Sequence, residues 1–223
     1  MEKQQCLLET IKSEAKFTAS YTGRKKFAQR VMDAMAAVDR ENFVSLQYLS
    51  LAYDNGPLPI GYGQTISQPY IVALMTDLLD LTAESIVLEV GTGSGYQAAV
   101  LSRLAKQVYS IERVKELAES AGERLNELGY NNIEIQNRDG YSGWQEKAPF
   151  DGIIVTAAAS HIPPALIEQL KTGGRMVIPV GLPHMHQELM LITKNEKGVV
   201  DTESLLGVAF VPLITDEEGV NKN

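Results

Sequence analysis

A glycine-rich segment between an apolar run and a helical pattern is the part of this sequence best suited to hold a ligand. Residues 89–95 read Glu-Val-Gly-Thr-Gly-Ser-Gly and overlap the end of the apolar run 85–90. Glycine lets the backbone reverse sharply and lets a ligand approach the bare main chain, and the helix predicted behind the turn offers unpaired N–H groups. Glu112 ends the next apolar run, where a carboxylate is suited to bind ribose hydroxyls. The segment therefore predicts a cofactor that carries a ribose.

Two cofactors compete for such a turn, a dinucleotide and S-adenosylmethionine. The dinucleotide fingerprint G-x-G-x-x-G requires glycine at position 96, where this chain has Tyr96, and its third glycine is instead Gly95. Glu89 at the end of the first strand would repel a pyrophosphate, but its charge suits the ammonium group of a methionine moiety. Asp139 and Gly140, by themselves only a turn signal, add a carboxylate suited to bind an adenine amino group. The spacing favours S-adenosylmethionine.

The residue types near the turn argue against several methyl acceptors. Methylation of cytosine C5 needs a cysteine nucleophile, and the one cysteine, Cys6, lies far from the predicted catalytic part of the chain. Methylation of adenine amino groups usually uses a D/N-P-P-Y/F loop after the fourth strand, where this chain reads Val-Thr-Ala-Ala-Ala at 155–159. Transfer to a catechol needs magnesium held by carboxylates, and no further acidic cluster stands near these strands. The small residues at 155–159 predict either the close approach of backbone or substrate, or ordinary strand–helix packing.

Alternating apolar runs and amphipathic segments predict the elements that position these residues. From residue 85 onward strands and helices alternate, which indicates a mostly parallel sheet covered by helices on both faces. The predicted strands are 85–90, 107–112, 133–136, 152–156, 175–180, 189–193 and 205–211, and the predicted helices are 96–105, 114–128 and 162–170. No helical pattern separates the last two strands, so we expect an antiparallel edge. The predicted fold class is α/β, a seven-stranded Rossmann-like fold of S-adenosylmethionine-dependent methyltransferases.

We expect one compact domain in three parts. Residues 1–80 read mostly as helix, interrupted by a loop over 51–69 that is rich in Gly and Pro. Long loops inside compact domains are usually functional or mobile. Residues 81–215 form the predicted cofactor-binding core, and the polar residues 216–223 form a tail that we expect to fray.

Composition and charge argue against several classes of function. The 223 residues include 28 acidic and 20 basic side chains, and the formal charge of −8 disfavours sequence-independent binding of nucleic acid. One cysteine rules out an internal disulfide framework and a cysteine-based metal site, and three histidines alone argue against a catalytic zinc. The first residues lack the apolar stretch of a signal peptide, and no apolar run is long enough to cross a bilayer. We therefore expect a cytoplasmic protein without a metal, nucleic-acid or membrane partner.

Five segments of the chain are similar to signature segments of one enzyme family. They read LPIGYGQTISQPY at 58–70, VLEVGTGSGYQ at 87–97, APFDGIIVTAAA at 148–159, GGRMVIPVG at 173–181 and FVPL at 210–213. In this combination the chain resembles the protein-L-isoaspartate O-methyltransferases of bacterial type, over about residues 30–215. The element Thr65-Ile66-Ser67 is specific to this family rather than to methyltransferases in general.

The resemblance implies a repair enzyme that uses S-adenosylmethionine to methylate the α-carboxylate of L-isoaspartyl residues in damaged proteins, releasing S-adenosylhomocysteine. The ester then closes spontaneously to a succinimide, which hydrolyses partly to normal aspartate. The resemblance places Ser67 in the active site and Val211 and Pro212 at the border of the substrate. Together with the turn described above, it assigns these residues to the cofactor: Thr65, Ile66, Glu89, Gly91, Thr92, Gly93, Gly95, Glu112, Asp139 and Gly140. The expected partners are isoaspartyl proteins and peptides, and we expect a monomer.

Several alternatives remain open. Ser67 is also suited to cap the helix that follows, because the sequence Ser67-Gln68-Pro69 is typical of a helix start. Tyr70 stands where animal members of the family have His, which leaves the role of this side chain in the cofactor pocket open. A small carboxylic acid is an alternative substrate. A module that binds S-adenosylmethionine without turnover is a further alternative, against which the intact Ser67 loop argues.

Overall fold

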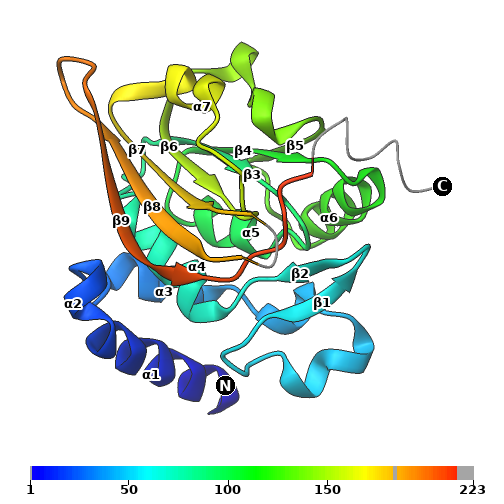
Figure 1. Cartoon of the computed structure of the whole chain (residues 1–223). Helices are drawn as coiled ribbons and strands as arrows, with labels where there is room; N and C mark the ends of the chain where they lie inside the picture. The colour runs from blue at the N-terminus through cyan, green and yellow to red at the C-terminus, as the bar shows by residue number, and fades with distance from the viewer. Residues whose placement is uncertain (1, 183–184, 215–223) are drawn as a thin grey trace.

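A seven-stranded sheet forms the centre of the protein, whose computed structural model describes residues 2–182 and 185–214 (Figure 1). Its strands are β3 (Ile86–Val90), β4 (Gln107–Glu112), β5 (Ile133–Asn137), β6 (Phe150–Val155), β7 (Leu170–Val180), β8 (Gln187–Lys194) and β9 (Val200–Val208). They lie in the order β5-β4-β3-β6-β7-β8-β9. Neighbours from β5 to β7 are parallel, whereas β8 and β9 are antiparallel. The predicted mostly parallel sheet with an antiparallel edge is confirmed.

Helices cover the two faces of this sheet unequally. The helical elements of the core are α4 (Pro69–Leu78), α5 (Tyr96–Ser102), α6 (Lys115–Glu127), η3 (Gly140–Ser142), η4 (Gln145–Lys147) and α7 (Pro164–Gln169). The face that carries Val87 and Val108 packs against α4, α5 and α6. The opposite face, with Leu88 and Ile153, packs against α7 and the segment around η3. Both faces are buried at the central strands, which explains why β3 and β6 read as near-continuous apolar runs, whereas the edge strand β5 alternates apolar and polar residues.

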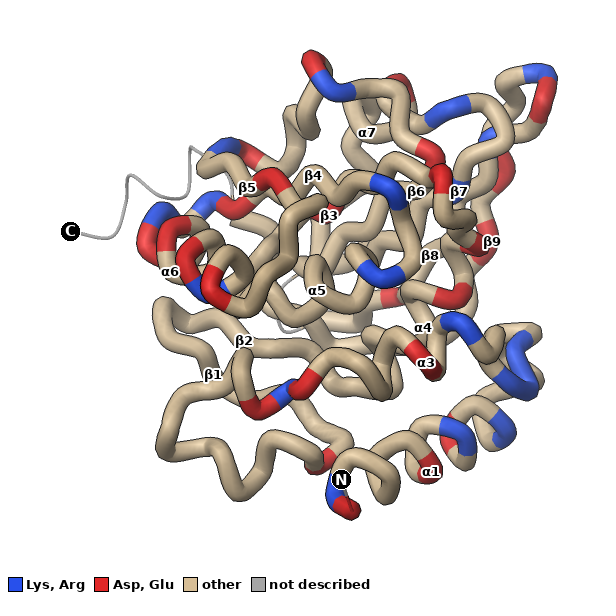
Figure 2. The backbone as a smooth tube through the Cα atoms, turned by 180° about the vertical axis from the view of Figure 1, so that it is seen from behind, with Lys and Arg blue, Asp and Glu red and all other residues tan. Residues whose placement is uncertain are grey.

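The residues before α4 form a further layer that packs on α4 and α5. It contains α1 (Glu2–Phe17), α2 (Ala19–Thr22), α3 (Gln29–Ala37), η1 (Arg40–Phe43), η2 (Leu46–Leu51) and the strands β1 (Leu58–Gly61) and β2 (Gln64–Ile66). Every residue of α4 is buried between this layer and the sheet. Residues 55–76 contain no charged side chain, and β1 and β2 accordingly lack acidic and basic positions in Figure 2. No helix in the described part of the chain is long and apolar enough to cross a bilayer.

Two predicted segments differ from the structure. The segment 51–69, which we predicted as a loop, contains an antiparallel hairpin of β1 and β2 whose turn is Gly61-Tyr62-Gly63, all at positive φ. Strands of three and four residues are too short to show an alternating pattern. The last strand, predicted at 205–211, is β9 at Val200–Val208. Its first residues are polar and exposed because β9 is the outer edge of the sheet, so apolar runs did not reveal them. The predicted tail 216–223 lies outside the described residues.

Candidate active site

A crevice opens at the carboxyl ends of β3, β4 and β6, the place where open parallel sheets bind ligands. The structure brings most of the predicted site residues together here: Thr65, Ile66, Ser67, Gly91, Thr92, Gly93, Glu112, Gly140, Val211 and Pro212 all line the crevice. Three predicted residues, Glu89, Gly95 and Asp139, do not line it. Each of these three has another role in the fold, described below.

The glycine turn forms one wall of the crevice. The φ angle is +100° at Gly91 and +53° at Gly93, a region that side-chain-bearing residues rarely adopt. The Thr156 hydroxyl donates a hydrogen bond to the Gly91 carbonyl over 2.6 Å and occupies the space that a Cβ of Gly91 would need. A Cβ on Gly93 would point toward Ile60 of the hairpin, 3.3 Å away. The turn is therefore held open as bare backbone.

Glu112 is fixed in the crevice by the backbone. Its Oε2 accepts a hydrogen bond from the Gly93 N–H over 2.8 Å, and its Oε1 accepts one from the Val114 N–H over 2.9 Å. The side chain is 7% exposed. Charge-assisted bonds of this kind fix the orientation of a carboxylate before any ligand arrives. This arrangement suits the hydroxyls of a ribose, as the sequence predicted for a carboxylate at the end of the second core strand.

Glu89 lies beneath the turn rather than in the crevice. It is fully buried, accepts a hydrogen bond from the Ser110 hydroxyl, and Ser110 in turn contacts the Thr92 hydroxyl over 2.6 Å. Burial raises the pKa of Glu89 to about 8, and the hydrogen bond from Ser110 only partly opposes this effect. Glu89 therefore lies beneath the lining of the crevice, and its burial raises the pKa and favours the protonated form of the carboxyl.

Gly95 and Asp139 shape the backbone around the crevice. Gly95, at φ +86°, precedes α5, and a Cβ there would come within 3.0 Å of Leu125 on α6. The Asp139 carboxylate accepts a hydrogen bond from the Tyr141 N–H over 2.8 Å and caps η3. Gly140 next to it does line the crevice, and a Cβ there would meet Leu213 at 2.9 Å.

The segment 211–213 closes the crevice from the side of β6. The Ala158 N–H donates to the Val211 carbonyl over 2.8 Å, and the Leu213 N–H donates to the Ala158 carbonyl over 2.8 Å. The sequence left two explanations for the small residues at 155–159. The structure supports the close approach of backbone, because segment 211–213 pairs with Ala158.

Ser67 lies between the hairpin and α4. The helix begins at Pro69 with Gln68 in the capping position, and no side chain caps it, so the interpretation of Ser67 as a helix cap is wrong. The Ser67 hydroxyl makes no hydrogen bond to any residue that the structure describes, whereas its carbonyl accepts one from Arg40 over 2.9 Å. The hydroxyl is therefore available to a ligand.

An open groove of about 670 Å³ adjoins the crevice at Thr65 and Ser67. Its walls come from α1, from α4 and from the end of β9, and include Glu14, Thr18, Tyr70 and residues 206–210. The Tyr70 hydroxyl lies 2.5 Å from the Thr18 hydroxyl, and burial raises the pKa of Tyr70. Tyr70 thus faces this groove rather than the crevice.

Sequence reasoning missed several residues of the site. Thr156 holds the Gly91 carbonyl, and Gln187 holds both the N–H and the carbonyl of Phe210 at 2.6 and 3.1 Å. Glu14 contributes a carboxylate to the groove from the first helix. Thr156 lies within the signature segment 148–159, but its role is a hydrogen bond to backbone, which residue type alone does not reveal. Gln187 and Glu14 lie outside the signature segments, so no local motif pointed to them. Within the ranges that the structure describes, no cluster of three His, Cys, Asp or Glu residues is suited to a metal ion.

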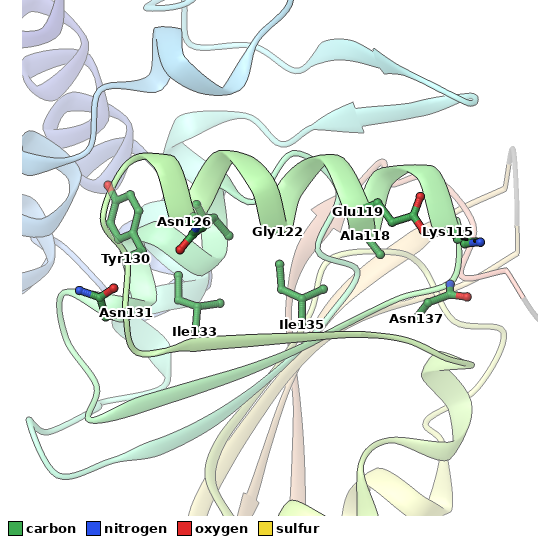
Figure 3. Close-up of a pocket in the computed structure, with 11 residues that line it drawn as sticks. Lys115, Ala118, Glu119, Gly122, Asn126, Tyr130, Asn131, Ile133, Ile135 and Asn137 are labelled. Atoms are coloured by element: carbon green, nitrogen blue, oxygen red, sulfur yellow. Dashed lines mark ion pairs between the residues drawn. The ribbon is translucent and has the colours of Figure 1, made fainter.

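A second groove lies on the far side of α6, between this helix and the edge strand β5 (Figure 3). Ile133 and Ile135 point from the strand toward the helix, and Asn126 and Tyr130 flank one end. The groove has a volume of about 520 Å³ but contains none of the predicted site residues. The chemistry is therefore to be sought in the crevice and the groove beside Ser67.

Comparison with known proteins decides between the families that such a site allows. Residues 16–218 match the family model of the protein-L-isoaspartate(D-aspartate) O-methyltransferases. The chain belongs to this family. It is 58% identical over 207 residues to protein-L-isoaspartate O-methyltransferase 2 of Syntrophobacter fumaroxidans, covering 93% of this chain and 84% of that one. It is 56% identical over 218 residues to the protein of the same name from Nitrosococcus oceani, covering 98% and 99% of the two chains.

Solved structures of the same family share the fold. One protein-L-isoaspartate O-methyltransferase superposes with a TM-score of 0.83 at 28% identity, covering 96% of this chain and 66% of that one. A second, from Plasmodium falciparum in complex with S-adenosyl-L-homocysteine, superposes with a TM-score of 0.78 at 27% identity, covering 95% and 98%. The predicted fold class and the resemblance drawn from the five segments are both confirmed.

Proposed function

We propose that this protein transfers a methyl group from S-adenosylmethionine to the α-carboxylate of L-isoaspartyl residues in damaged proteins. The methyl ester then closes to a succinimide without further help from the enzyme, which begins the repair. The observation that carries the proposal is the position of Ser67, which lines both the crevice behind the glycine turn and the open groove beside it. A cofactor on one side and a peptide on the other would meet there.

The residues of the crevice fit S-adenosylmethionine. The fixed carboxylate of Glu112 suits the ribose hydroxyls, and the bare backbone of Gly91 and Gly93 admits the methionine part at close range. Ile111 and Leu213 offer apolar surface to the adenine. Further contacts of the cofactor are proposed for these residues: Thr65, Ile66, Thr92 and Gly140. When bound, the cofactor supplies an electrophilic methyl group on a sulfonium ion.

The acceptor needs no general base. A carboxylate has a pKa near ~4 and is ionised at pH 7, so the protein must only align the acceptor oxygen and exclude water. We assign the alignment to Ser67, whose free hydroxyl can donate a hydrogen bond to the acceptor carboxylate. The hairpin above the turn and the segment 211–213 shield the reacting atoms from solvent, and Val211 and Pro212 border the substrate.

Selectivity for isoaspartate follows from geometry in this proposal, because normal aspartate is ionised as well. In an isoaspartyl residue the carboxylate sits directly on the α-carbon, while the main chain passes through the β-carbon. The groove is walled by residues 206–210 and by the segment from Thr65 into the start of α4, and its open form suits an extended peptide. A misplacement of ~1 Å costs on the order of 10²-fold in rate. A groove that fixes the peptide on both sides of the residue would therefore align only the isoaspartyl carboxylate.

Methylation of a matched pair of peptides tests the proposal. An L-isoaspartyl peptide should be methylated at least ~10²-fold faster, in kcat/KM, than its L-aspartyl twin. Equal rates on the two peptides, or on a free small carboxylic acid, would favour the alternative of a small-molecule carboxyl methyltransferase. Binding of S-adenosylhomocysteine without any transfer would favour the alternative of a non-catalytic binding module.

We also propose that the enzyme works as a monomer in the cytoplasm, without nucleic-acid or membrane partners. The net charge of −8 supports the absence of a nucleic-acid partner. The division into a region 1–80 that carries the active-site loop and a core 81–215 that holds the cofactor is likewise a proposal. Removal of divalent metals with a chelator should leave the rate unchanged if, as we expect, no metal takes part.

A further inference from the structure

Arg40, at the start of η1, is a buried cation that neither the motifs nor the chemistry above accounts for. Its side chain is 0% exposed, and no acidic side chain pairs with it within the described ranges. Its Nε is also buried without a hydrogen-bond partner there. Burial lowers the pKa of Arg40 to about 10, so the guanidinium still carries its charge at neutral pH. An uncompensated buried charge destabilises a fold, and an apolar residue of similar size would be tolerated better.

The contacts of Arg40 bring together three parts of the active site. One terminal nitrogen donates to the Ser67 carbonyl over 2.9 Å, and the other donates to the Gly56 carbonyl over 3.0 Å. Gly56 and Ser67 are the two ends of the segment that contains the hairpin β1–β2. The guanidinium also lies over the ring of Tyr96, 5.2 Å from its centroid, and Tyr96 is the first residue of α5 after the glycine turn.

We propose that Arg40 is a positioning residue, which sets the place of Ser67 relative to the glycine turn and thereby aligns the acceptor with the cofactor. The inference rests on the proposed function. The planar guanidinium fixes three directions at once, toward two carbonyls and one ring face, which the single ammonium group of a lysine cannot do. Glu14 joins the residues just outside these two ends, because its Oε2 accepts hydrogen bonds from Asn55 over 2.7 Å and from Gln68 over 3.4 Å. Arg40 instead binds the carbonyls of Gly56 and Ser67 themselves and also contacts the ring of Tyr96 behind the glycine turn.

The charge of Arg40 has a second consequence for the acceptor. It lies one hydrogen bond from the Ser67 backbone, where the reaction binds an anionic carboxylate. Within a poorly solvated interior such a charge acts over several ångströms with little screening. Arg40 therefore favours occupation of the site by the ionised substrate, in addition to fixing its geometry.

The variant Arg40→Lys tests the proposal, because lysine keeps the positive charge but lacks the planar guanidinium whose two terminal nitrogens bind the two carbonyls. We expect an unchanged Kd for S-adenosylhomocysteine by calorimetry, within about threefold, and a kcat on the isoaspartyl peptide that falls by about 10- to 100-fold. The rate is expressed per cofactor-binding site, so that loss of folded protein does not count as loss of catalysis. The matched control is Arg175→Lys, since Arg175 also donates to a backbone carbonyl, that of Leu78 over 3.2 Å, away from the crevice. This control should keep the parental kcat.

The outcomes separate the inference from the proposed function. A parental kcat per binding site in Arg40→Lys, with only a lower melting temperature, would overturn the inference and leave the function standing. An unaltered protein that does not methylate the isoaspartyl peptide would overturn the proposed function itself. If Arg40→Lys does not fold, Tyr96→Leu carries the test, because it removes the ring under the guanidinium and leaves both hydrogen bonds. There we expect a kcat loss of about 3- to 10-fold at parental cofactor affinity, and an unchanged kcat would overturn the inference.

Discussion

Glu89→Gln tests how the region beneath the glycine turn is built. The Glu89 carboxyl is fully buried, and this burial raises its pKa from the ordinary 4.5 to about 8, with nearby Glu112 adding to the effect. Glutamine keeps the shape and an acceptor for the Ser110 hydroxyl, but it has no ionisable proton. The variant therefore isolates the cost of ionising this side chain in the folded protein.

The magnitude follows from the two pKa values of Glu89. Between pH 4.5 and pH 8 the folded protein holds one proton more than the unfolded chain at this group, so the free energy of unfolding falls as the pH rises. The contribution of protonated Glu89 to the free energy of unfolding is fully present below pH 4.5 and is lost progressively toward pH 8. The slope is about 1.4 kcal/mol per pH unit. Between pH 5 and pH 7 the parent should thus lose about 2–3 kcal/mol relative to Glu89→Gln.

Urea unfolding followed by the fluorescence of Trp144, which is 5% exposed, measures this difference. The variant and the parent should have similar stability near pH 5, and the variant should gain steadily on the parent up to pH 7. Glu84→Gln is the control, since the Glu84 side chain is 83% exposed and its substitution should give a difference that does not change with pH. A flat difference for Glu89→Gln between pH 5 and pH 7 would mean that the buried carboxyl is ionised, and would refute the reasoning.

Three further substitutions probe the crevice and the groove. Ser67→Ala should lower kcat/KM about 10- to 150-fold, the loss of a hydrogen bond to a charged group, at nearly unchanged cofactor affinity by calorimetry. Gly93→Val places a branched side chain at φ +53° beside Ile60 and should abolish binding of S-adenosylhomocysteine while cooperative unfolding persists; calorimetry showing parental affinity would contradict the assigned crevice. Because Glu14 places a carboxylate in the groove, the parent should show a KM about 2- to 5-fold lower for an isoaspartyl peptide with a neighbouring lysine than for a neutral peptide. Glu14→Gln should abolish this difference in KM.

The sequence predicted those parts of the protein whose signal is local. The glycine turn and the carboxylate of Glu112 follow apolar strands within a few residues, and the structure brings them into one crevice. The central parallel strands β3 and β6 were predictable because both of their faces are buried and their residues are mostly apolar. Strand β9 was visible only in part because an edge strand exposes polar residues, and the hairpin β1–β2 was hidden because its strands are so short.

Parts of the site that depend on distant segments were not predictable in the same way. Whether Glu89 faces the crevice or the interior depends on Ser110 of the neighbouring strand. Arg40 stands between Asp39 and Glu41 in the sequence and thus resembles a solvated cluster of charges, although its side chain is completely buried. The groove is lined by residues of α1 and of the end of β9, and no sequence pattern within either segment predicts that the two lie side by side.

The pairing of segment 211–213 with Ala158 has a consequence for the order in which the protein becomes active during its synthesis. The glycine turn and Glu112 leave the ribosome early, but the crevice still lacks the wall that Val211 and Leu213 provide. Domains form as their residues emerge from the N-terminus onward. The residues proposed to contact the cofactor are therefore made well before the wall that completes the crevice. We expect a chain truncated before Val211 to bind S-adenosylhomocysteine more weakly than the full chain, which calorimetry would measure.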